Sequence, residues 1–471
     1  MGGIVAYGAY VPYHRLERSA IGATLGSGGG QGTRAVASYD EDTTSMGVEA
    51  ARIALADLSG GAGVERLYFA TASPAYLDKT NAAAIHAALG LSPEAAAFDM
   101  GGAVRSGVGA FWAGAEARVP TVVVLSDIRV GLPGGSDERD GGDGAAAFLF
   151  DGDGDVPVLA EVVGEAVRSA EFIDRWRLPG DAVSRVWEER FGETVYLPLA
   201  RGAFADALER AGLGPKDVDH LVVTGVHPRA VRSAAALTGV PAEAVVDDLT
   251  SVIGNTGTAH PGLVLADVLD RAGAGELIAL LVLADGASVV LLRTTEALVS
   301  RRAARSVADQ IAAGRPGLSY ATFLSWRGFL PRQPPRRPDP RGPSAPAAYR
   351  SLHWKLAFTG SRCRTCAMVY LPPRRACASC GTIDEMDPAP LADVTGTVAT
   401  FTIDELAYTP SPPLVGAVVD FDGGGRLRCQ LTDVDPDELR VGDRVEMTFR
   451  RIVTAEGIHN YFWKARPRRH A

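Results

Sequence analysis

Leu221-Val-Val-Thr-Gly-Val-His227 is an apolar, β-rich run of strand length that ends in a histidine. A buried strand that delivers a polar side chain at its C-terminal edge is a common way to line an α/β active site. The glycine-rich stretch Ile253-Gly-Asn-Thr-Gly-Thr-Ala-His260 follows another short apolar run and precedes a helical pattern. Two such turns can bring a histidine and an asparagine onto one carbonyl group. We therefore expect an α/β fold whose site contains His227 and Asn255, with His260 as a further candidate.

Length and composition indicate a soluble protein of several domains. The 471 residues are enough for two or three domains, and 46% hydrophobic with 22% charged residues is ordinary for a globular chain. A net charge of -9 argues against a protein devoted to nucleic acid. No apolar run approaches the ~20 residues of a membrane span. The N-terminus reads as a strand rather than a signal peptide, so we expect no membrane association and a cytoplasmic location.

The cysteines lie in one part of the chain. The first of the five is Cys363, so the first 360 residues contain none. This distribution excludes a disulfide framework and fits a reducing compartment. It also leaves the large N-terminal part without a cysteine nucleophile.

Alternating strand-like and helix-like segments fill residues 1–160, and the stretch from 165 to 215 reads as mainly helical. Residues 218–295 then repeat the strand, loop and helix order of the first part. We therefore predict two α/β halves of one duplicated fold, residues 1–160 and residues 161–329, the second with a helical insertion. A proline-dense segment over 330–346 favours extended polyproline II and predicts a semi-rigid linker.

Two CxxC pairs follow the linker, Cys363-Arg-Thr-Cys366 and Cys377-Ala-Ser-Cys380. This spacing is typical of a tetrahedral zinc ribbon, which we assign to residues 347–390. Four thiolates leave no open coordination position, so we expect the Zn²⁺ to be structural. Cys429 has no partner of this kind and reads as a small core residue. Short strands separated by turns over 391–471 indicate a small β-barrel.

Several different short motifs lie along the first 295 residues, at 3–12, 40–44, 126–127, 131–134, 144–148, 190–193 with Tyr196, 226–227 and 254–256. In order and spacing they resemble the thiolase superfamily, nearest to the archaeal and bacterial HMG-CoA synthases and the related ketoacyl synthases III. The resemblance implies a duplicated thiolase-like fold with layers in the order α-β-α-β-α.

The C-terminal part carries a second resemblance, at 360–363, 372–374, Cys377 and 396–398. These runs are similar to the zinc-ribbon and OB-fold family that accompanies thiolases and HMG-CoA synthases. The resemblance implies that residues 391–471 form an OB-fold, which would position an acyl carrier or bridge to a thiolase or ketosynthase partner.

The first resemblance also implies roles for the site residues. His227 would polarise an acyl-thioester carbonyl or act as acid and base, and Asn255 would donate to a developing enolate. Arg232 stands where the resembling enzymes carry a lysine that touches coenzyme A. The substrate carrier would be coenzyme A or a phosphopantetheine thioester, and the protein a homodimer. The alternatives are a buried histidine bonded to backbone, a turn asparagine and a solvated surface arginine.

The chain departs from this family at the positions of two catalytic residues. The nucleophilic cysteine of the family aligns with Val104, and its catalytic glutamate with Ala72. Neither side chain can form an acyl-enzyme or transfer a proton. Ser106 is a conceivable substitute nucleophile without an evident base, and Tyr76 and Tyr196 are candidates for proton transfer by analogy with cysteine-less thiolase-fold aldolases.

These observations favour an acyl-thioester enzyme that makes or breaks a carbon–carbon bond by His/Asn-stabilised enolate chemistry, without a cysteine acyl-enzyme. It would be a condensing acyltransferase or an aldolase-type lyase. The alternative is a catalytically degenerate scaffold within a thiolase or ketosynthase complex. Nucleic-acid binding is a third class, supported by the basic tail from Lys464 to His470 but disfavoured by the acidic net charge.

Overall fold

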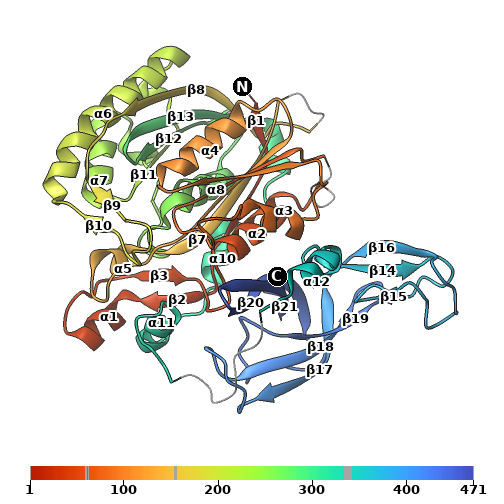
Figure 1. Cartoon of the computed structure of the whole chain (residues 1–471). Helices are drawn as coiled ribbons and strands as arrows, with labels where there is room; N and C mark the ends of the chain where they lie inside the picture. Colours follow the sequence, from red (N-terminus) through yellow and green to blue (C-terminus); the bar gives the residue numbers. More distant parts are fainter. Residues whose placement is uncertain (1, 59–60, 62, 153–155, 334–341, 470–471) are drawn as a thin grey trace.

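The computed structural model describes residues 2–58, 61, 63–152, 156–333 and 342–469. A large layered body holds the first two thirds of the chain, and a zinc-ribbon-like hairpin with a small barrel holds the rest (Figure 1).

The first half of the body contains strands β1 (Gly3–Tyr10), β4 (Arg66–Thr71), β5 (Ala96–Gly101), β6 (Thr121–Ile128) and β7 (Asp143–Asp151). They pair in the order β5-β4-β6-β7-β1. The pairs among β4, β5 and β6 are parallel, and β7 is antiparallel to both neighbours. All nine residues of β7 are buried, as expected for a central strand covered on both faces.

The second half repeats this arrangement. Strands β8 (Ala160–Ser169), β11 (His220–Gly225), β12 (Leu277–Leu283) and β13 (Gly286–Thr294) pair in the order β11-β12-β13-β8. A parallel bridge from Leu221 to Val245 occupies the place that β5 has in the first half. A short antiparallel contact between β1 and β8 joins the halves into one nine-stranded order. The predicted duplication is confirmed.

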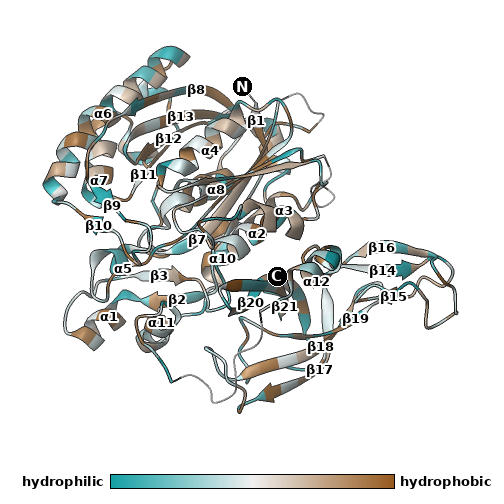
Figure 2. Ribbon diagram, viewed as in Figure 1, coloured by the Kyte–Doolittle hydropathy of each residue, from teal (hydrophilic) through white to brown (hydrophobic). Residues whose placement is uncertain are grey.

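Helices form three layers around the two halves of the sheet (Figure 1). Helices α4 (Arg105–Ala115) and α8 (His260–Arg271) lie between the halves and share one buried apolar cluster with their inner faces. Helices α2 (Thr43–Ala54) and α3 (Ala82–Ala88) cover the outer face of the first half, and α6 (Glu189–Ala211) and α7 (Pro228–Leu237) that of the second. The layers therefore follow the predicted α-β-α-β-α order. Figure 2 shows hydrophobic and hydrophilic residues alternating along the outer helix α6.

Shorter elements frame this body. They are β2 (His14–Glu17), α1 (Arg18–Leu25), β3 (Thr33–Val36), α5 (Ser136–Asp140), β9 (Arg175–Trp176), β10 (Arg185–Val186), α9 (Glu296–Ser300), α10 (Val307–Ala312) and α11 (Tyr320–Trp326), with 3-10 turns at Pro215–Asp217, Ala242–Ala244 and Gly257–Ala259. The prediction that residues 165–215 are mainly helical is wrong before residue 189, because β8 extends to Ser169 and the β9–β10 hairpin follows.

The C-terminal part begins with α12 (Ala345–Arg350) and α13 (Leu352–Lys355), then forms a three-stranded ribbon from β14 (Thr359–Cys363), β15 (Val369–Tyr370) and β16 (Met386–Pro390). Residues 334–341 of the predicted linker lie outside the described residues, and α12 begins within the range assigned to the linker.

Five antiparallel strands then form the barrel: β17 (Gly396–Asp404), β18 (Leu414–Phe421), β19 (Arg426–Gln430), β20 (Arg444–Ala455) and β21 (Ile458–Pro467). Their order is β19-β18-β17-β20-β21, and a bridge from Leu431 to Ala465 closes the barrel. Closure removes the free strand edges that a five-stranded sheet would otherwise expose.

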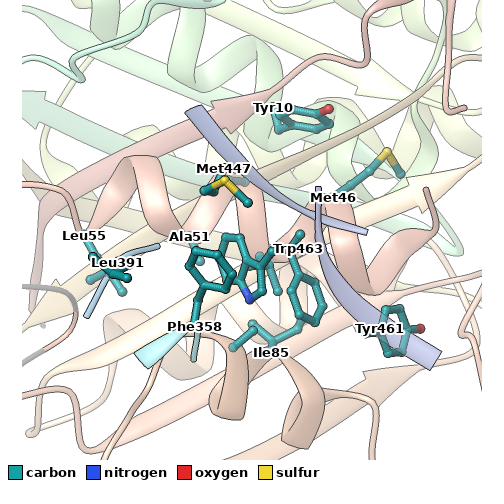
Figure 3. Packing of buried hydrophobic residues seen from close by; sticks show 14 of the residues in the cluster. Tyr10, Met46, Ala51, Leu55, Ile85, Phe358, Leu391, Met447, Tyr461 and Trp463 are labelled. Atoms are coloured by element: carbon teal, nitrogen blue, oxygen red, sulfur yellow. The ribbon is translucent and has the colours of Figure 1, made fainter. Parts of the chain in front are cut away.

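The barrel packs firmly against α2. Figure 3 shows Met447 and Trp463 of the barrel and Phe358 of the ribbon in one cluster with Ala51 and Ile85 of the body. Charged groups surround this apolar contact, and they are buried as well. The basic tail beginning at Lys464 is therefore part of the interface: Lys464 Nζ lies 2.8 Å from Asp40, and Arg466 Nη2 lies 3.0 Å from Glu49. Because these two side chains are buried and paired, they are not available to nucleic acid.

Candidate functional site

His227 follows the end of β11 and forms the N-cap of α7. Its Nδ1 accepts a hydrogen bond from the backbone N–H of Ala230 at 3.1 Å. A neutral imidazole that accepts at Nδ1 carries its proton on Nε2. Pro228 starts α7, where its missing N–H costs no hydrogen bond. The strand and the cap together fix the position and the tautomer of the imidazole.

Asn255 lies on a loop that packs against residues 140–142. Its backbone N–H donates to Asp140 at 2.8 Å, and its carbonyl accepts from Gly142 at 2.9 Å. The preceding Gly254 has a φ of +76°, and a Cβ there would lie 2.1 Å from the carbonyl oxygen of Gly141. Only glycine fits this approach.

The Asn255 carboxamide is held by backbone on both sides. Its Nδ2 donates to the carbonyl of Gly225 at 2.8 Å, and its Oδ1 accepts from the N–H of Gly257 at 2.9 Å. A carboxamide has two N–H groups, and these contacts use one of them. Since Gly225 ends the strand that delivers His227, the amide is tied to the same strand end as the imidazole.

His260 is the first residue of α8 and is almost fully buried. Its Nδ1 accepts from the backbone N–H of Thr256 at 3.3 Å. Burial lowers the pKa of His260 to about 4, although the charge and backbone of Asp248 favour the protonated form. The imidazole is therefore neutral at pH 7.

All four residues predicted from sequence line one cleft of about 890 Å³: His227, Asn255, His260 and Arg232. This volume is typical of a site for a cofactor-sized ligand. The cleft is rich in arginines, which are Arg18, Arg129, Arg139, Arg175, Arg229 and Arg232.

Most of these arginines have acidic partners. Arg139 lies 2.6 Å from Asp140, and Arg229 lies 3.3 Å from Glu193. Arg232 is exposed, and among the described residues its side chain has no ion pair or hydrogen bond. It is thus a free cation on the rim of the cleft, which suits a phosphate group.

A second, smaller pocket of about 100 Å³ adjoins the cleft and shares Arg129, Arg175 and Val226 with it. Val104 and Ala72 line this pocket, so the structure brings together the two positions at which the chain departs from the family pattern. Val104 forms the N-cap of α4, and Ala72 follows β4.

The other candidates for the nucleophile and for proton transfer do not line the cleft. Ser106 donates its hydroxyl to the carbonyl of Gly101 at 3.0 Å and lines neither pocket. Tyr76 contacts the barrel, where its hydroxyl accepts from the N–H of His459 at 2.7 Å. Tyr196 is buried in the small pocket, where its hydroxyl accepts from the N–H of Asp285 at 3.3 Å. Burial raises the pKa of Tyr196, so its phenol stays protonated.

Asp174 was not predicted from the sequence. A Cβ placed on Gly192 of α6 would lie 2.7 Å from Asp174 Oδ1 and 2.8 Å from His227 Nε2, so both groups reach the same turn of α6. Burial raises the pKa of Asp174, whereas the nearby His227 lowers it. The stretch around Asp174 reads as helical, and no spacing in it indicates that an acid reaches the imidazole.

Asp137 was not predicted from the sequence either. It lies 3.3 Å from Arg129 Nη2 and accepts both Nη groups of Arg175. Burial raises the pKa of Asp137, but these hydrogen bonds and charges outweigh it and hold the pKa below its ordinary value. Asp137 thereby fixes the two arginines that form the wall between the cleft and the small pocket.

The four cysteines of the ribbon form the predicted cluster. Their Sγ atoms all lie within 4.8 Å of one another, with Cys363 and Cys380 3.7 Å apart and Cys366 and Cys377 3.4 Å apart. Tetrahedral Zn²⁺ with Zn–S bonds of about 2.3 Å requires sulfurs about 3.8 Å apart. The residues therefore fit a four-coordinate zinc ion. Among the described residues, no helix has both the length and the apolar character that a membrane crossing requires.

Comparisons with solved structures define the class of the fold. HMG-CoA synthase complexed with CoA superimposes with a TM-score of 0.60 at 18% identity, over 69% of this chain and 89% of that one. 3-Oxoacyl-[acyl-carrier-protein] synthase III from Aquifex aeolicus superimposes with a TM-score of 0.54 at 21% identity, over 62% of this chain and all of that one. The body therefore has the thiolase-like fold of the condensing enzymes.

Sequence comparisons identify the family. The hydroxymethylglutaryl-CoA synthase of Pyrobaculum aerophilum is 30% identical over 349 residues, 70% of this chain and 98% of the relative. That of Pyrococcus furiosus is 29% identical over 335 residues, 69% of this chain and 95% of the relative. The chain belongs to the hydroxymethylglutaryl-CoA synthase family.

Two family models match parts of the chain. The C-terminal model of 3-oxoacyl-[acyl-carrier-protein] synthase III matches residues 208–293, which include His227 and Asn255. The model of the C-terminal OB-fold domain of ChsH2 matches residues 389–450. The barrel is thus an OB-fold fused to a synthase-like body, as the sequence predicts.

Proposed function

We propose that the protein is an enzyme of acyl thioesters that makes or breaks a carbon–carbon bond through an enolate stabilised by His227 and Asn255. The relatives are named as HMG-CoA synthases, and the similar structures are an HMG-CoA synthase complexed with CoA and a 3-oxoacyl-[acyl-carrier-protein] synthase III. The observation that carries the proposal is that Asn255 is tied to Gly225, at the strand end that delivers His227, in one cleft of ligand size.

The chemistry follows from the donors. The thioester oxygen would accept hydrogen bonds from His227 Nε2–H and from the second N–H of the Asn255 carboxamide. These donors stabilise the negative charge that reaches this oxygen when a bond to the α-carbon breaks. In decarboxylation or retro-aldol cleavage, the electron pair of the broken bond enters the enolate. Protonation at the α-carbon, or attack on an electrophile, consumes it.

A covalent acyl-enzyme does not belong to this proposal. Val104 and Ala72 cannot attack or transfer a proton, and the body contains no cysteine. The acyl donor would be held non-covalently.

The carrier would be coenzyme A or the phosphopantetheine arm of a carrier protein. Arg232 supports this assignment, since a free arginine on the cleft rim can bind a phosphate. We further propose a cytoplasmic homodimer that can associate with a thiolase or ketosynthase partner. A structural Zn²⁺ held by Cys363, Cys366, Cys377 and Cys380 would stabilise the ribbon, supplying folding energy rather than chemistry.

The alternative is a degenerate scaffold of a thiolase or ketosynthase complex. Two observations favour it: the Asn255 carboxamide bonds to backbone on both sides, and His227 caps a helix. Both contacts would persist in a protein that performs no reaction.

The test is incubation with a panel of acyl-CoA and acyl-carrier-protein thioesters, followed by mass spectrometry of small products and of the intact protein. We expect a product whose acyl group has gained or lost carbon atoms, and no acyl group attached to the protein. His227→Ala should abolish that product. A partner complex that keeps full activity with His227→Ala, together with no turnover by the chain alone, would support the scaffold instead.

A further inference from the structure

The turn between β12 and β13 places Asp285 at the same edge of the sheet as His227. Strands β11 and β12 are parallel, and Gly225 pairs with Leu283 where both strands end. His227 and Asp285 each lie two residues beyond this pair. Paired strands are about 4.8 Å apart, and polar groups at the carboxyl ends of parallel strands line the sites of α/β proteins. The two side chains therefore start from neighbouring points of one site.

Asp285 lines the small pocket of about 100 Å³ that adjoins the cleft. Ala72 and Val104, the two positions at which the chain departs from the family pattern, line the same pocket. Among the described residues of this lining, Asp285 alone carries a carboxylate. The pocket therefore lacks an acid at the end of β4, where the resembling enzymes carry a glutamate, and has one at the end of β12.

The main chain of Asp285 is held in a conformation that few side chains adopt. Its φ is +44°, in the left-handed region that favours glycine. The Tyr196 hydroxyl accepts from the N–H of Asp285 at 3.3 Å, and Arg105 of α4 donates to its carbonyl. Glycine would fit this turn without strain, so the turn itself does not require aspartate. Backbone of this kind clusters at functional sites.

The carboxylate of Asp285 is available for chemistry. Within the described part of the chain it has no hydrogen bond and no ion pair. Burial raises the pKa of Asp285, opposed by the charge of Arg105 and assisted by that of Glu171. A more basic carboxylate is a better proton acceptor. Because the side chain is also exposed, substrate and solvent can both reach it.

The neighbouring acids are less suited to proton transfer. Asp174 is 3% exposed and lines neither the cleft nor the small pocket, so a substrate does not reach it. Tyr196 lines the small pocket, but burial raises its pKa and its phenol keeps its proton at pH 7. Asp137 lines the cleft and is paired with two arginines. Asp285 combines access with an unpaired carboxylate.

We propose that Asp285 is the acid and base that transfers the proton at the α-carbon of the bound thioester. The inference rests on the proposed function, because it names the group that forms or protonates the enolate stabilised by His227 and Asn255. In the forward step a carboxylate oxygen takes the α-proton. The C–H bond breaks, an O–H bond forms, and the electron pair of the C–H bond enters the enolate, whose charge lies on the thioester oxygen. The reverse step returns the proton from the carboxyl group to carbon.

The test measures hydrogen exchange at the α-carbon, which needs no second substrate and breaks no carbon–carbon bond. The full-length protein is incubated with acetyl-CoA or butyryl-CoA in D₂O, and mass spectrometry measures deuterium in the acyl group. We expect exchange by the parent protein with at least one thioester. Asp285→Asn should slow this exchange by about 100-fold or more. Asparagine tolerates a positive φ, so this variant removes the base and keeps the turn.

Two further variants separate the base from the fold. Asp285→Gly also fits the turn without a carboxylate and should lose exchange to the same extent. Asp384→Asn is the matched control, because Asp384 has a φ of +60° and lies outside both pockets, and exchange should be unchanged. Isothermal titration should show that both Asp285 variants bind the exchanging thioester within about twofold of the parent protein.

Three results would overturn the inference: undiminished exchange in Asp285→Asn, no exchange by the parent protein with either thioester, or a loss of exchange that matches a loss of binding. A carbon–carbon product formed without any need for Asp285 would overturn this inference and uphold the proposed function. Exchange that requires Asp285, with no such product from the thioester panel, would uphold the residue and contradict the proposed reaction.

Discussion

Arg450 Nη1 of the barrel lies 2.6 Å from Glu41 Oε1 of the body, and both side chains are buried. The same guanidinium lies 2.6 Å from Asp433. A buried ion pair of this kind adds little net stability when complete, but the loss of one partner leaves an uncompensated charge. The barrel is therefore held to α2 as one unit with the body, rather than tethered by the linker alone.

Arg450→Met should lower the free energy of unfolding by about 3–5 kcal/mol, because it leaves Glu41 and Asp433 buried without their cation. Urea unfolding followed by circular dichroism measures this change. The exposed pair Arg375–Asp384 provides the control, and Arg375→Gln should change stability by less than about 1 kcal/mol. If Arg450→Met is as stable as the parent protein, the buried network does not hold the interface.

Gly192→Ala should displace the His227 imidazole, because the new Cβ would lie 2.7 Å from both the His227 ring and Asp174. We expect changed chemical shifts of the His227 ring, measured by NMR of ¹³C-labelled histidine, and loss of at least tenfold in any His227-dependent turnover. Gly109→Ala on α4 meets nothing within 4 Å and should leave both unchanged. Unaltered chemical shifts of the His227 ring in Gly192→Ala would mean that α6 does not constrain the imidazole.

Sequence was sufficient where local patterns decide the structure. The apolar run ending at His227 forms β11, the glycine-rich loop presents Asn255, and the two CxxC pairs form one cluster. Each of these depends on residues close together in the chain. The period of the strands and the spacing of the cysteines therefore carried the prediction.

Sequence was insufficient where distant segments meet. Lys464 and Arg466 read as a basic tail, because their partners Asp40 and Glu49 lie about four hundred residues earlier. Asp174 lies near His227 because the segment before β9 and the turn of α6 at Gly192 meet beside the imidazole. No periodicity or spacing encodes such contacts.

His260 makes stability pH-dependent in acid. Its pKa is about 4 in the folded protein, compared with 6.5 unperturbed, because burial disfavours the imidazolium. Between pH 4 and pH 6.5 the His260 imidazole is protonated in the unfolded chain but neutral in the folded protein. Stability is therefore complete above pH 6.5 and falls as the pH drops toward 4.

His260→Asn should flatten this slope, measured as the free energy of unfolding from pH 7 to pH 4. The slope should not vanish, because burial also lowers the pKa of His14 to about 4. His353→Asn changes an exposed histidine and is the control. An unchanged slope in His260→Asn would contradict the assignment of a buried, neutral imidazole.

The cysteine cluster predicts one zinc ion per chain. Elemental analysis of the purified protein should find it, and Cys377→Ser should lose it and unfold the ribbon, because three thiolates no longer complete the tetrahedron. Cys429→Ser changes the one cysteine outside the cluster and should retain the metal. Full zinc content in Cys377→Ser would rule out the four-thiolate site.

We expect two copies of the chain to associate through the outer edge of β5. Within the described residues β5 pairs with β4 alone, and Phe98 at its centre is 52% exposed. An unpaired edge with an exposed aromatic residue is a template for pairing with another strand. We expect the parent protein to have twice its chain mass of 49.3 kDa by light scattering, and Phe98→Glu to be monomeric, because the carboxylate would be buried in the pairing. Leu406→Glu changes a side chain of the barrel that is 96% exposed and should remain dimeric. A dimer that persists in Phe98→Glu would show that the two copies meet at another surface. A monomeric parent protein would show that the copies do not associate.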